Sequence, residues 1–339
     1  MTRPLRAMAA PEMRILRPLF IAVLFSQVAA AAPMDLLASA GPASSDISAL
    51  LWGLTILSVA VVVIVAGLVL GGIILRGKRV AGALPAVERR SGGVGWIYFG
   101  VALTTVALIG IAGWTVATMA QIQAPSGSEL TIEVDARQWW WKLHYDTGVA
   151  ATSFDTANEI HIPTSHPVRV KVTSADVIHS FWVPALGGKT DAIPGRINET
   201  WLQADKAGAY RGQCVEFCGA QHAMMALNLF ADTPADFQRW AETQLSAATP
   251  SASGEQQFLA RCGGCHTVRG TLAGGATGPD LTHLMGRTTI AAGTLENSPE
   301  TLAGWIADPQ AIKPGTRMPK VDLSADELQA IVSFLSGLK

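Results

Sequence analysis

Charge and cysteine are both scarce in this sequence. Charged residues make up 15% of the 339 residues, and the formal net charge is −1. Because a nucleic-acid-binding protein carries a basic excess that matches the phosphates, this class of function is excluded. The four cysteines form two tight pairs, Cys214 with Cys218 and Cys262 with Cys265. A small domain held together by disulfides would show a different pattern, so the pairs indicate cofactor sites.

The N-terminus has the three parts of a secretory signal peptide. A region with four arginines precedes an apolar core, Leu19–Val28, and the small residues Ala29–Ala32. A third membrane span is the alternative, but roughly ten apolar residues are too few to cross a bilayer, which needs about 20. We therefore predict that residues 1–32 are a cleaved signal peptide and that the protein is exported.

Two long stretches contain neither a charged residue nor a histidine, Ile47–Leu75 and Val94–Ile122. Each is longer than the about 20 residues that a helix needs to span hydrocarbon. A buried helix of a soluble protein would be shorter and would show a polar face. The sequence therefore predicts a transmembrane hairpin within residues 45–123, with the polar residues 44–46 capping its first helix.

The loop between these stretches is basic, with Glu88 as its one acidic residue. Lysine and arginine concentrate in cytoplasmic loops, so we expect this loop inside the cell and both termini outside. The signal peptide predicts the same topology. We therefore expect a bacterial-type inner-membrane protein whose region after Gln123 lies on the periplasmic face. The basic residues of the loop are Arg76, Lys78, Arg79, Arg89 and Arg90.

Beyond a linker at 124–128, the apolar pattern changes to a period of two. Apolar and polar residues alternate over 130–134 and again over 168–173. Such alternation predicts half-buried strands. Further strands are expected near 200–204 and 226–230. We predict a small antiparallel β-barrel or sandwich over residues 128–245.

The last segment, residues 255–339, has helical periodicity and follows a small-residue linker at 246–254. In Ser324–Leu338, apolar residues recur at helical spacing, and Ser324 and Glu327 are placed as a capping box. The sequence predicts a compact helical domain here.

The run Cys262-Gly263-Gly264-Cys265-His266 is the attachment motif of a c-type haem. Two neighbouring thiols add to the two vinyl groups of one porphyrin, and the adjacent histidine reaches the iron. Zinc is the alternative, but it needs two further ligands. Met318 is our candidate for the sixth iron ligand, because a thioether opposite histidine raises the reduction potential. Met285 and His283 are weaker candidates.

A second group of metal ligands surrounds the other cysteine pair. Cys214, Cys218 and His222 fall within nine residues, Met224 and Met225 follow, and His179 lies upstream. Soft thiolate and thioether ligands favour copper, and two cysteines can bridge two copper ions with one histidine on each. Two alternatives stay open: a Cys2His2 zinc site, and three residues that merely share one helix face.

Residues 45 to about 235 resemble subunit II of haem–copper cytochrome c oxidases. The resemblance is carried by Val177-Ile178-His179-Ser180-Phe181-Trp182-Val183-Pro184, by Lys189-Thr190-Asp191-Ala192-Ile193-Pro194-Gly195-Arg196, and by the segment Cys214–Met225. The C-terminal segment resembles a class I cytochrome c in its haem motif, in Gly278-Pro279-Asp280-Leu281, in Trp305 and in Gly315-Thr316-Arg317-Met318-Pro319.

These resemblances imply a multidomain fold: a two-helix transmembrane hairpin, a cupredoxin-like β-barrel with a dinuclear copper centre, and an all-α class I cytochrome c domain with covalent haem c. They assign as copper ligands His179, Cys214, Cys218, His222 and Met225, together with the backbone carbonyl of Glu216. The Glu216 side chain would bind magnesium shared with the catalytic subunit. Trp139 stands where electrons are expected to enter, whereas Trp140 and Trp141 are interpreted as structural.

The function implied is that of a subunit of cytochrome c oxidase, an oxidoreductase and translocase. Electrons would pass from cytochrome c or a similar donor through the haem and the copper pair to catalytic subunit I, which reduces oxygen and translocates protons. Subunit III and membrane lipid are the other expected partners. This chain lacks the histidine cluster of the oxygen-reducing centre, so it is not expected to reduce oxygen alone. The alternatives are the corresponding subunit of a copper-containing nitric oxide reductase and a copper-binding assembly protein.

The sequence departs from the oxidase family at the start of the second span. Many members have a glutamate three residues before a tryptophan there, at the mouth of a proton channel. Here Trp96 is present, but Gly93 takes the place of the glutamate, and Glu88 is the nearest acid. Three histidines, His144, His161 and His166, have no motif around them and are interpreted as structural.

Overall fold

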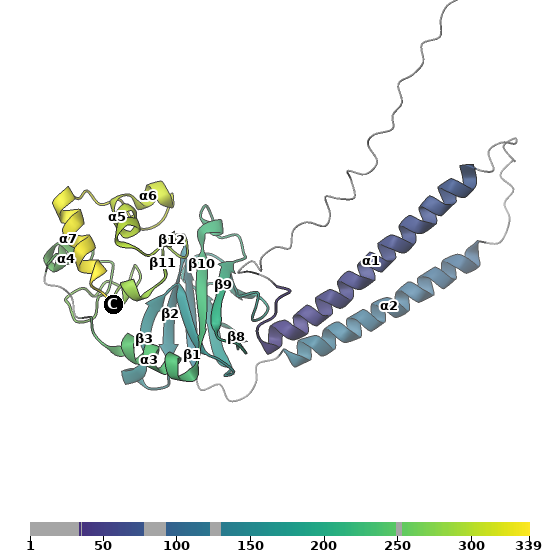
Figure 1. The fold of residues 1–339 in the computed structure, drawn as a ribbon, viewed down its shortest axis with the longest axis horizontal. Coiled ribbons are helices and arrows are strands. Elements are labelled where there is room, and N and C mark those ends of the chain that lie inside the picture. Colours follow the sequence, from purple (N-terminus) through teal and green to yellow (C-terminus); the bar gives the residue numbers. More distant parts are fainter. Residues whose placement is uncertain (1–33, 35, 78–92, 123–129, 249–252) are drawn as a thin grey trace, which may run out of the picture. The chain divides into compact units, whose positions relative to one another are not determined.

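The computed structural model describes residue 34 and residues 36–77, 93–122, 130–248 and 253–339 (Figure 1). The predicted signal peptide lies outside these residues. So do Lys78, Arg79, Glu88, Arg89 and Arg90 of the predicted cytoplasmic loop.

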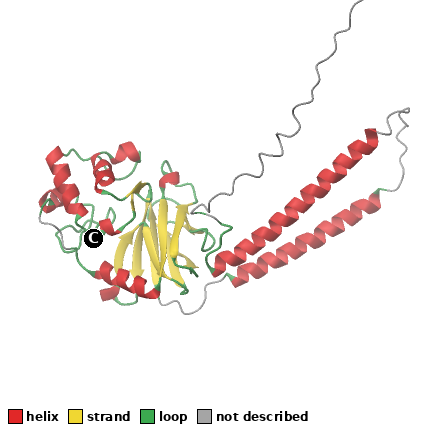
Figure 2. Cartoon of the chain, viewed as in Figure 1, coloured by secondary structure: helices red, strands yellow, loops and turns green. Residues whose placement is uncertain are grey.

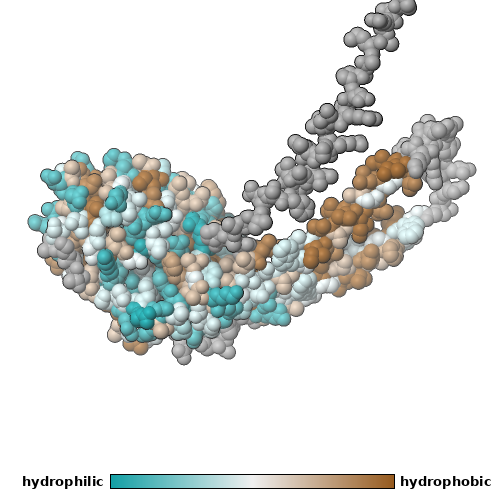
Figure 3. Space-filling model, viewed as in Figure 1, coloured by the Kyte–Doolittle hydropathy of each residue, from teal (hydrophilic) through white to brown (hydrophobic). Residues whose placement is uncertain are grey.

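Two long helices form the N-terminal part of the described chain. They are α1, Pro42–Gly77, and α2, Val94–Gln121, and both are long and apolar enough to cross a membrane. Their apolar side chains are exposed, as Figure 3 shows along both helices. The predicted start of the first helix was wrong: α1 begins at Pro42, so residues 44–46 lie inside its first turns. The Ser44 hydroxyl still caps the helix from inside, because it accepts a bond from the Gly41 amide at 3.2 Å and donates one to the Gly41 carbonyl at 2.9 Å.

Residues 130–245, here called the sandwich domain, form two five-stranded sheets (Figure 2). The β1–β5 and β4–β10 pairs are parallel, and the other strand pairs of these sheets are antiparallel. The predicted cupredoxin-like layout is confirmed. One sheet has the order β3 (Phe154–Ala157), β2 (Trp140–Asp146), β1 (Thr131–Arg137), β5 (Val168–Ser174) and β8 (Asn198–Leu202). The other has the order β4 (Glu159–Pro163), β10 (Ala226–Asp232), β9 (Gly208–Cys214), β6 (His179–Trp182) and β7 (Thr190–Ala192).

The core of the sandwich follows from the period-two pattern. Ile132 and Val134 of β1 are fully buried, while the residues between them are only half-buried, and β5 repeats the alternation. Each such side chain leaves water on folding, which stabilises the domain by about 1.5–3 kcal/mol. The helix α3, Pro234–Leu245, packs Trp240 on the ring of His161 at 4.1 Å between centroids. His161 also bonds Asp232 at 2.7 Å, which agrees with its interpretation as structural.

Residues 253–339, here called the C-terminal domain, are mostly but not wholly helical. The helices are α4 (Glu255–Arg261), α5 (Pro299–Ala307), α6 (Pro309–Ile312) and α7 (Ala325–Ser336). The expectation of an all-α domain was too strict, because β11 (Thr289–Ile290) pairs with β12 (Leu295–Glu296) in a short hairpin. Ala291, Ala292 and Gly293 have positive φ in its turn, a feature that the helical pattern of the sequence did not reveal.

The helix α7 begins with the predicted capping box. Ser324 and Glu327 exchange hydrogen bonds, and bonds from the Ser324 backbone and from Arg261 lower the pKa of Glu327 to about 2. The ionised Glu327 therefore stabilises the folded domain. This stabilisation is fully present above the ordinary pKa of 4.5 and is lost as the pH falls towards 2.

We expect Ser324→Ala to lower the free energy of unfolding of the C-terminal domain by about 1 kcal/mol in denaturant titrations of the haem absorbance. Ser336→Ala on the same helix is the matched control, because its hydroxyl is buried without a hydrogen-bond partner among the described residues. An equal loss in both variants would contradict the capping interpretation.

Candidate metal and haem sites

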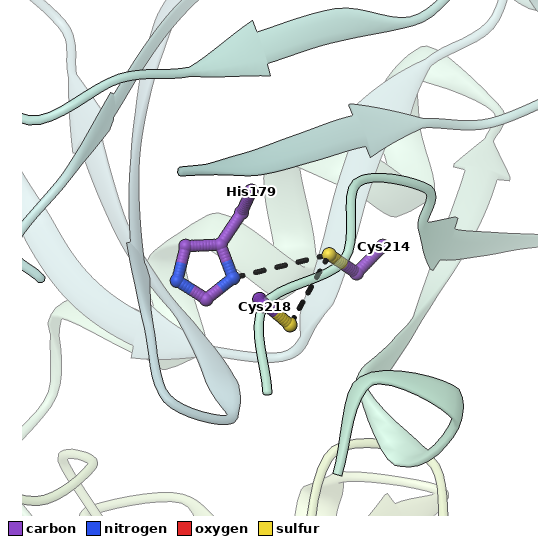
Figure 4. Close-up of side chains that lie close together, drawn as sticks. All are labelled: His179, Cys214 and Cys218. Carbon is purple, nitrogen blue, oxygen red and sulfur yellow. Dashed lines mark hydrogen bonds between the residues drawn. The ribbon is translucent and has the colours of Figure 1, made fainter. Parts of the chain in front are cut away.

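Strand pairing brings His179 next to the cysteine loop. His179 opens β6 and Cys214 closes β9, and these strands are antiparallel with Phe181 opposite Cys214. In Figure 4 the imidazole of His179 points at the sulfur of Cys214, with Cys218 beside them. All three side chains are buried. The fold thus joins two sequence segments that are 35 residues apart.

The ligand atoms are spaced as ligands of shared metal ions should be. The Sγ atoms of Cys214 and Cys218 are 3.7 Å apart, and Nδ1 of His179 lies 3.8 Å from Sγ of Cys214. On the other side, Nδ1 of His222 and Sδ of Met225 lie 3.6 and 3.9 Å from Sγ of Cys218. Bond lengths of about 2.0–2.3 Å in a tetrahedral site separate neighbouring ligands by roughly 3.3–3.8 Å. The donors therefore fit bound metal.

The arrangement suits two ions better than one. His179, Cys214 and Cys218 offer ligand atoms within 4.8 Å of one another, and His222 falls outside that group among the described residues. A single Cys2His2 zinc ion would need all four donors around one point. His222 and Met225 lie near Cys218, so the five residues together could hold two ions, and their soft donors favour copper. The shared-helix-face alternative is wrong, because the cysteines lie at a strand end and in a loop and only His222–Met224 form a short 3-10 turn.

The electrostatics of this site involve Asp176, which the sequence analysis did not assign. Its carboxylate accepts a bond from Nε2 of His179 at 2.9 Å, which leaves Nδ1 facing the sulfurs. Carboxylates commonly orient metal-binding histidines in this way. The hydrogen bond with Cys218, together with that with His179, holds the pKa of Cys214 well below the usual range of a thiol. The sequence held one sign of this role, namely that Asp176 lies three residues before His179.

Glu216 offers two different groups. Its backbone carbonyl lies 3.3 Å from Sγ of Cys214, within the ligand cluster, whereas its side chain is exposed. The carbonyl could therefore take part in holding a metal ion, whereas the exposed carboxylate lies outside the ligand cluster.

The haem motif lies at the end of α4 and lines a cavity. Cys262, Cys265, His266 and Met318 all border this cavity, together with Trp139 and Trp140 of the sandwich domain. Nδ1 of His266 bonds the Pro279 carbonyl at 2.9 Å, which leaves Nε2 for the iron. A Cβ at Gly278 would come within 2.5 Å of the His266 ring, so the glycine makes room for it. Burial lowers the pKa of His266 and favours the neutral form that ligates metal.

The three candidates for the sixth ligand are placed differently. Both methionines pack against the apolar core of the C-terminal domain, but of the two only Met318 also lines the cavity. Both ring nitrogens of His283 lie near carbonyl oxygens, those of Lys339 at 2.8 Å and Ser246 at 3.2 Å. The structure therefore favours Met318.

A half-buried arginine with one buried, unpaired nitrogen supports the fit to haem. Arg287 lines the same cavity, and its Nε has no hydrogen-bond partner among the described residues. Buried polar groups are nearly always paired. A haem carboxylate is an acceptor of the right charge for this guanidinium.

Trp139 lies between the two sites. Its indole N–H donates to the Cys218 carbonyl at 2.9 Å, and its side chain is buried. Gly219 of the cysteine loop packs on one part of the ring, where a Cβ would come within 3.1 Å. A Cβ at Gly315, three residues before Met318, would lie 3.6 Å from another part of the ring. Trp141 is instead in the sandwich core against Phe181, with centroids 5.7 Å apart, and Trp140 lies under Arg137 at 5.5 Å.

Comparison with known families matches the two domains separately. Residues 147–231 match the family described as "Cytochrome C oxidase subunit II, periplasmic domain", and residues 251–339 match the family "Cytochrome c". The chain is 39% identical over 215 residues to cytochrome c oxidase subunit 2 of Alkalihalophilus pseudofirmus. It is 33% identical over 228 residues to that of Bacillus sp. PS3. These alignments cover 61% and 62% of the relatives' length and the same shares of this chain.

Among solved structures, the chain is similar to the periplasmic domain of subunit II of cytochrome oxidase (CoxB) of Bradyrhizobium japonicum. The identity is 38%, and the match covers 36% of this chain and 96% of that one, with a TM-score of 0.34.

Proposed function

We propose that this chain, which joins a periplasmic domain of cytochrome c oxidase subunit II to a cytochrome c domain, receives electrons for a membrane-bound haem–copper oxidase. The observation that carries the proposal is the position of Trp139, which lines the haem cavity and bonds the carbonyl of Cys218. Haem c and a pair of copper ions would supply reversible one-electron chemistry when bound. The protein would supply a short, dry connection between them.

Each side chain has a role that its contacts support. Cys262 and Cys265 would hold the haem covalently, with His266 and Met318 on the iron. His179, Cys214, Cys218, His222 and Met225, with the Glu216 carbonyl, would hold the copper pair. Asp176 orients His179 through Nε2 at 2.9 Å. Because the sulfurs and His179 are buried, little water has to rearrange when charge arrives.

We further infer the surroundings of this chain. The helices α1 and α2 anchor it in the inner membrane, with both termini and both cofactor domains on the periplasmic face. Catalytic subunit I and subunit III are its partners, and cytochrome c or a similar protein is its donor. The exposed Glu216 carboxylate would bind magnesium at the contact with subunit I. Gly93 is the N-cap residue of α2 and stands where the family's channel-mouth glutamate is expected, so we propose that proton uptake does not rely on an acid at this position.

The decisive experiment is purification of the chain with its membrane partner and measurement of oxygen and nitric oxide consumption. Cytochrome-driven oxygen reduction to water supports the proposal. Nitric oxide reduction without oxygen reduction would favour the corresponding reductase. Release of copper to a chelator, with no partner and no electron transfer from the haem, would favour a copper assembly protein.

We expect Trp139→Leu to slow electron transfer from the haem to the copper centre at least tenfold, measured by flash photoreduction of the full chain. The reason is that leucine removes the aromatic ring that contacts both ligand loops. Trp140→Leu is the matched control. Trp140 lines the same cavity, but within the part of the chain that the structure describes its ring forms no hydrogen bond with Cys218. Equal rates in the Trp139 variant and the unmodified protein would exclude this path.

A further inference from the structure

Two ionisable side chains are buried where the sandwich and C-terminal domains meet, one from each domain. Lys313 of the C-terminal domain is 2% exposed, and Glu159 of the sandwich domain is 3% exposed. Lysine and glutamate are almost never buried without partners. Their partners therefore show what these two residues do.

Lys313 is held by three backbone carbonyls. Its ammonium donates to the carbonyls of Met224 at 2.7 Å, Trp139 at 2.8 Å and Ala291 at 3.0 Å. An ammonium has three donors, so this cage satisfies all of them. Two of the three carbonyls belong to the sandwich domain. Burial removes water from the ammonium and lowers the pKa of Lys313 to about 7, and the three carbonyls offset part of this cost.

Glu159 of the sandwich domain is held in turn by groups of the C-terminal domain. Its Oε1 accepts bonds from the backbone amides of Thr288 and Thr289, at 2.8 and 3.0 Å, and from the Thr288 hydroxyl at 2.5 Å. The side-chain amide of Asn228, opposite Glu159 in the β4–β10 pair, bonds both threonine hydroxyls at 3.2 Å. A carboxylate that accepts several N–H and O–H donors is a strong, directional contact.

Further contacts join the two domains. The backbone amide of Ala226 donates to the Ala292 carbonyl at 3.1 Å, and the Gln221 amide donates to the Pro314 carbonyl at 2.7 Å. Arg317, next to Met318, lies 3.2 Å from the carboxylate of Asp176. The docked face therefore includes the Met318 loop and the carboxylate that orients His179.

We propose that Lys313 and Glu159 are positioning residues that latch the C-terminal domain onto the sandwich domain, so that electrons cross between the two cofactors at one fixed separation. This inference rests on the proposed function. A domain on a small-residue linker would otherwise reach its partner by diffusion, at an effective concentration in the millimolar range. The latch also keeps Trp139, which is 7% exposed, covered by the haem-binding domain, so a separate donor protein must deliver its electron to the haem.

The test replaces one of the two latch residues, Lys313 or Glu159, and measures hydrogen exchange at the contacts of the other. It uses the full-length, haem-loaded chain without copper. For Lys313→Met, we expect amide hydrogen exchange at Thr288 and Thr289 to accelerate at least tenfold. For Glu159→Gln, which turns a nitrogen towards N–H donors, we expect the same acceleration at the Trp139 indole N–H. If hydrogen exchange accelerates only beside the substituted residue, or at neither place, the proposal is wrong.

The controls separate docking from folding and from function. Lys171→Met and Glu133→Gln remove a half-buried ion pair within the sandwich domain, 3.1 Å long, and should leave both readouts unchanged. If Glu159→Gln does not fold, Thr288→Val removes the hydroxyl from the other side of the same contact and is read at the same indole. In the copper-loaded chain, each latch variant should slow electron transfer at least tenfold and make it viscosity-dependent. Failure of copper to bind as a pair would refute the proposed function while leaving the exchange rates informative.

Discussion

Cys218→Ser is expected to abolish the dinuclear copper centre. Sγ of Cys218 is within 3.9 Å of donors from Cys214, His222 and Met225, so it is the atom that joins the two halves of the site. A serine hydroxyl is harder than a thiolate and stays protonated, which suits copper poorly. Loss of a group that only supports a metal ligand already lowers affinity about 10–100-fold, so we expect a larger loss here.

Electron paramagnetic resonance and metal analysis of the full chain measure this effect. The unmodified protein should show one electron shared over two coppers, and the variant should lose that signal and bind at most one copper. The haem spectrum should not change, since Cys218 does not border the haem cavity.

A matched methionine pair sharpens the result. Met225→Leu should perturb the copper signal because its side chain is fully buried at the site, whereas Met224→Leu should not, because Met224 is 41% exposed. If Cys218→Ser keeps the shared-electron signal, the bridging role of this cysteine is wrong.

Met318→Leu is expected to convert the haem from a low-spin, six-coordinate form to a high-spin form. Leucine fills the space of methionine but cannot ligate iron. The covalent bonds to Cys262 and Cys265 should persist, so the haem stays attached. Because axial ligands set haem potentials over a range of about 0.8 V, we expect the potential to fall by on the order of 100 mV or more. The donor would then reduce the haem less completely.

Optical spectra and a redox titration measure both changes. Met285→Leu is the matched control: this methionine packs against the core of the same domain without lining the cavity. A spin-state change in the Met285 variant, with none in the Met318 variant, would reverse the assignment of the sixth ligand.

Features that depend on neighbouring residues could be predicted from the sequence. The haem motif is confined to Cys262–His266, because two thiols and one imidazole must reach the same porphyrin. The cysteine loop Cys214–Met225 is similarly local. Long apolar stretches predicted two long helices, and period-two alternation predicted the buried faces of β1 and β5. The strand expected near 200–204 begins earlier, as β8 at Asn198, since strand ends depend on pairing partners.

Features that depend on distant contacts were decided by the tertiary structure. The β6–β9 pairing brings His179 to Cys214, and the cavity distinguishes Met318 from Met285. The roles of Lys313 and Glu159 could not be inferred from their sequence neighbours. On the sequence, both are ordinary polar residues that would be expected at the surface. Only docking of the two domains buries them, because a carbonyl cage and a set of N–H and O–H donors exist there only when distant segments meet.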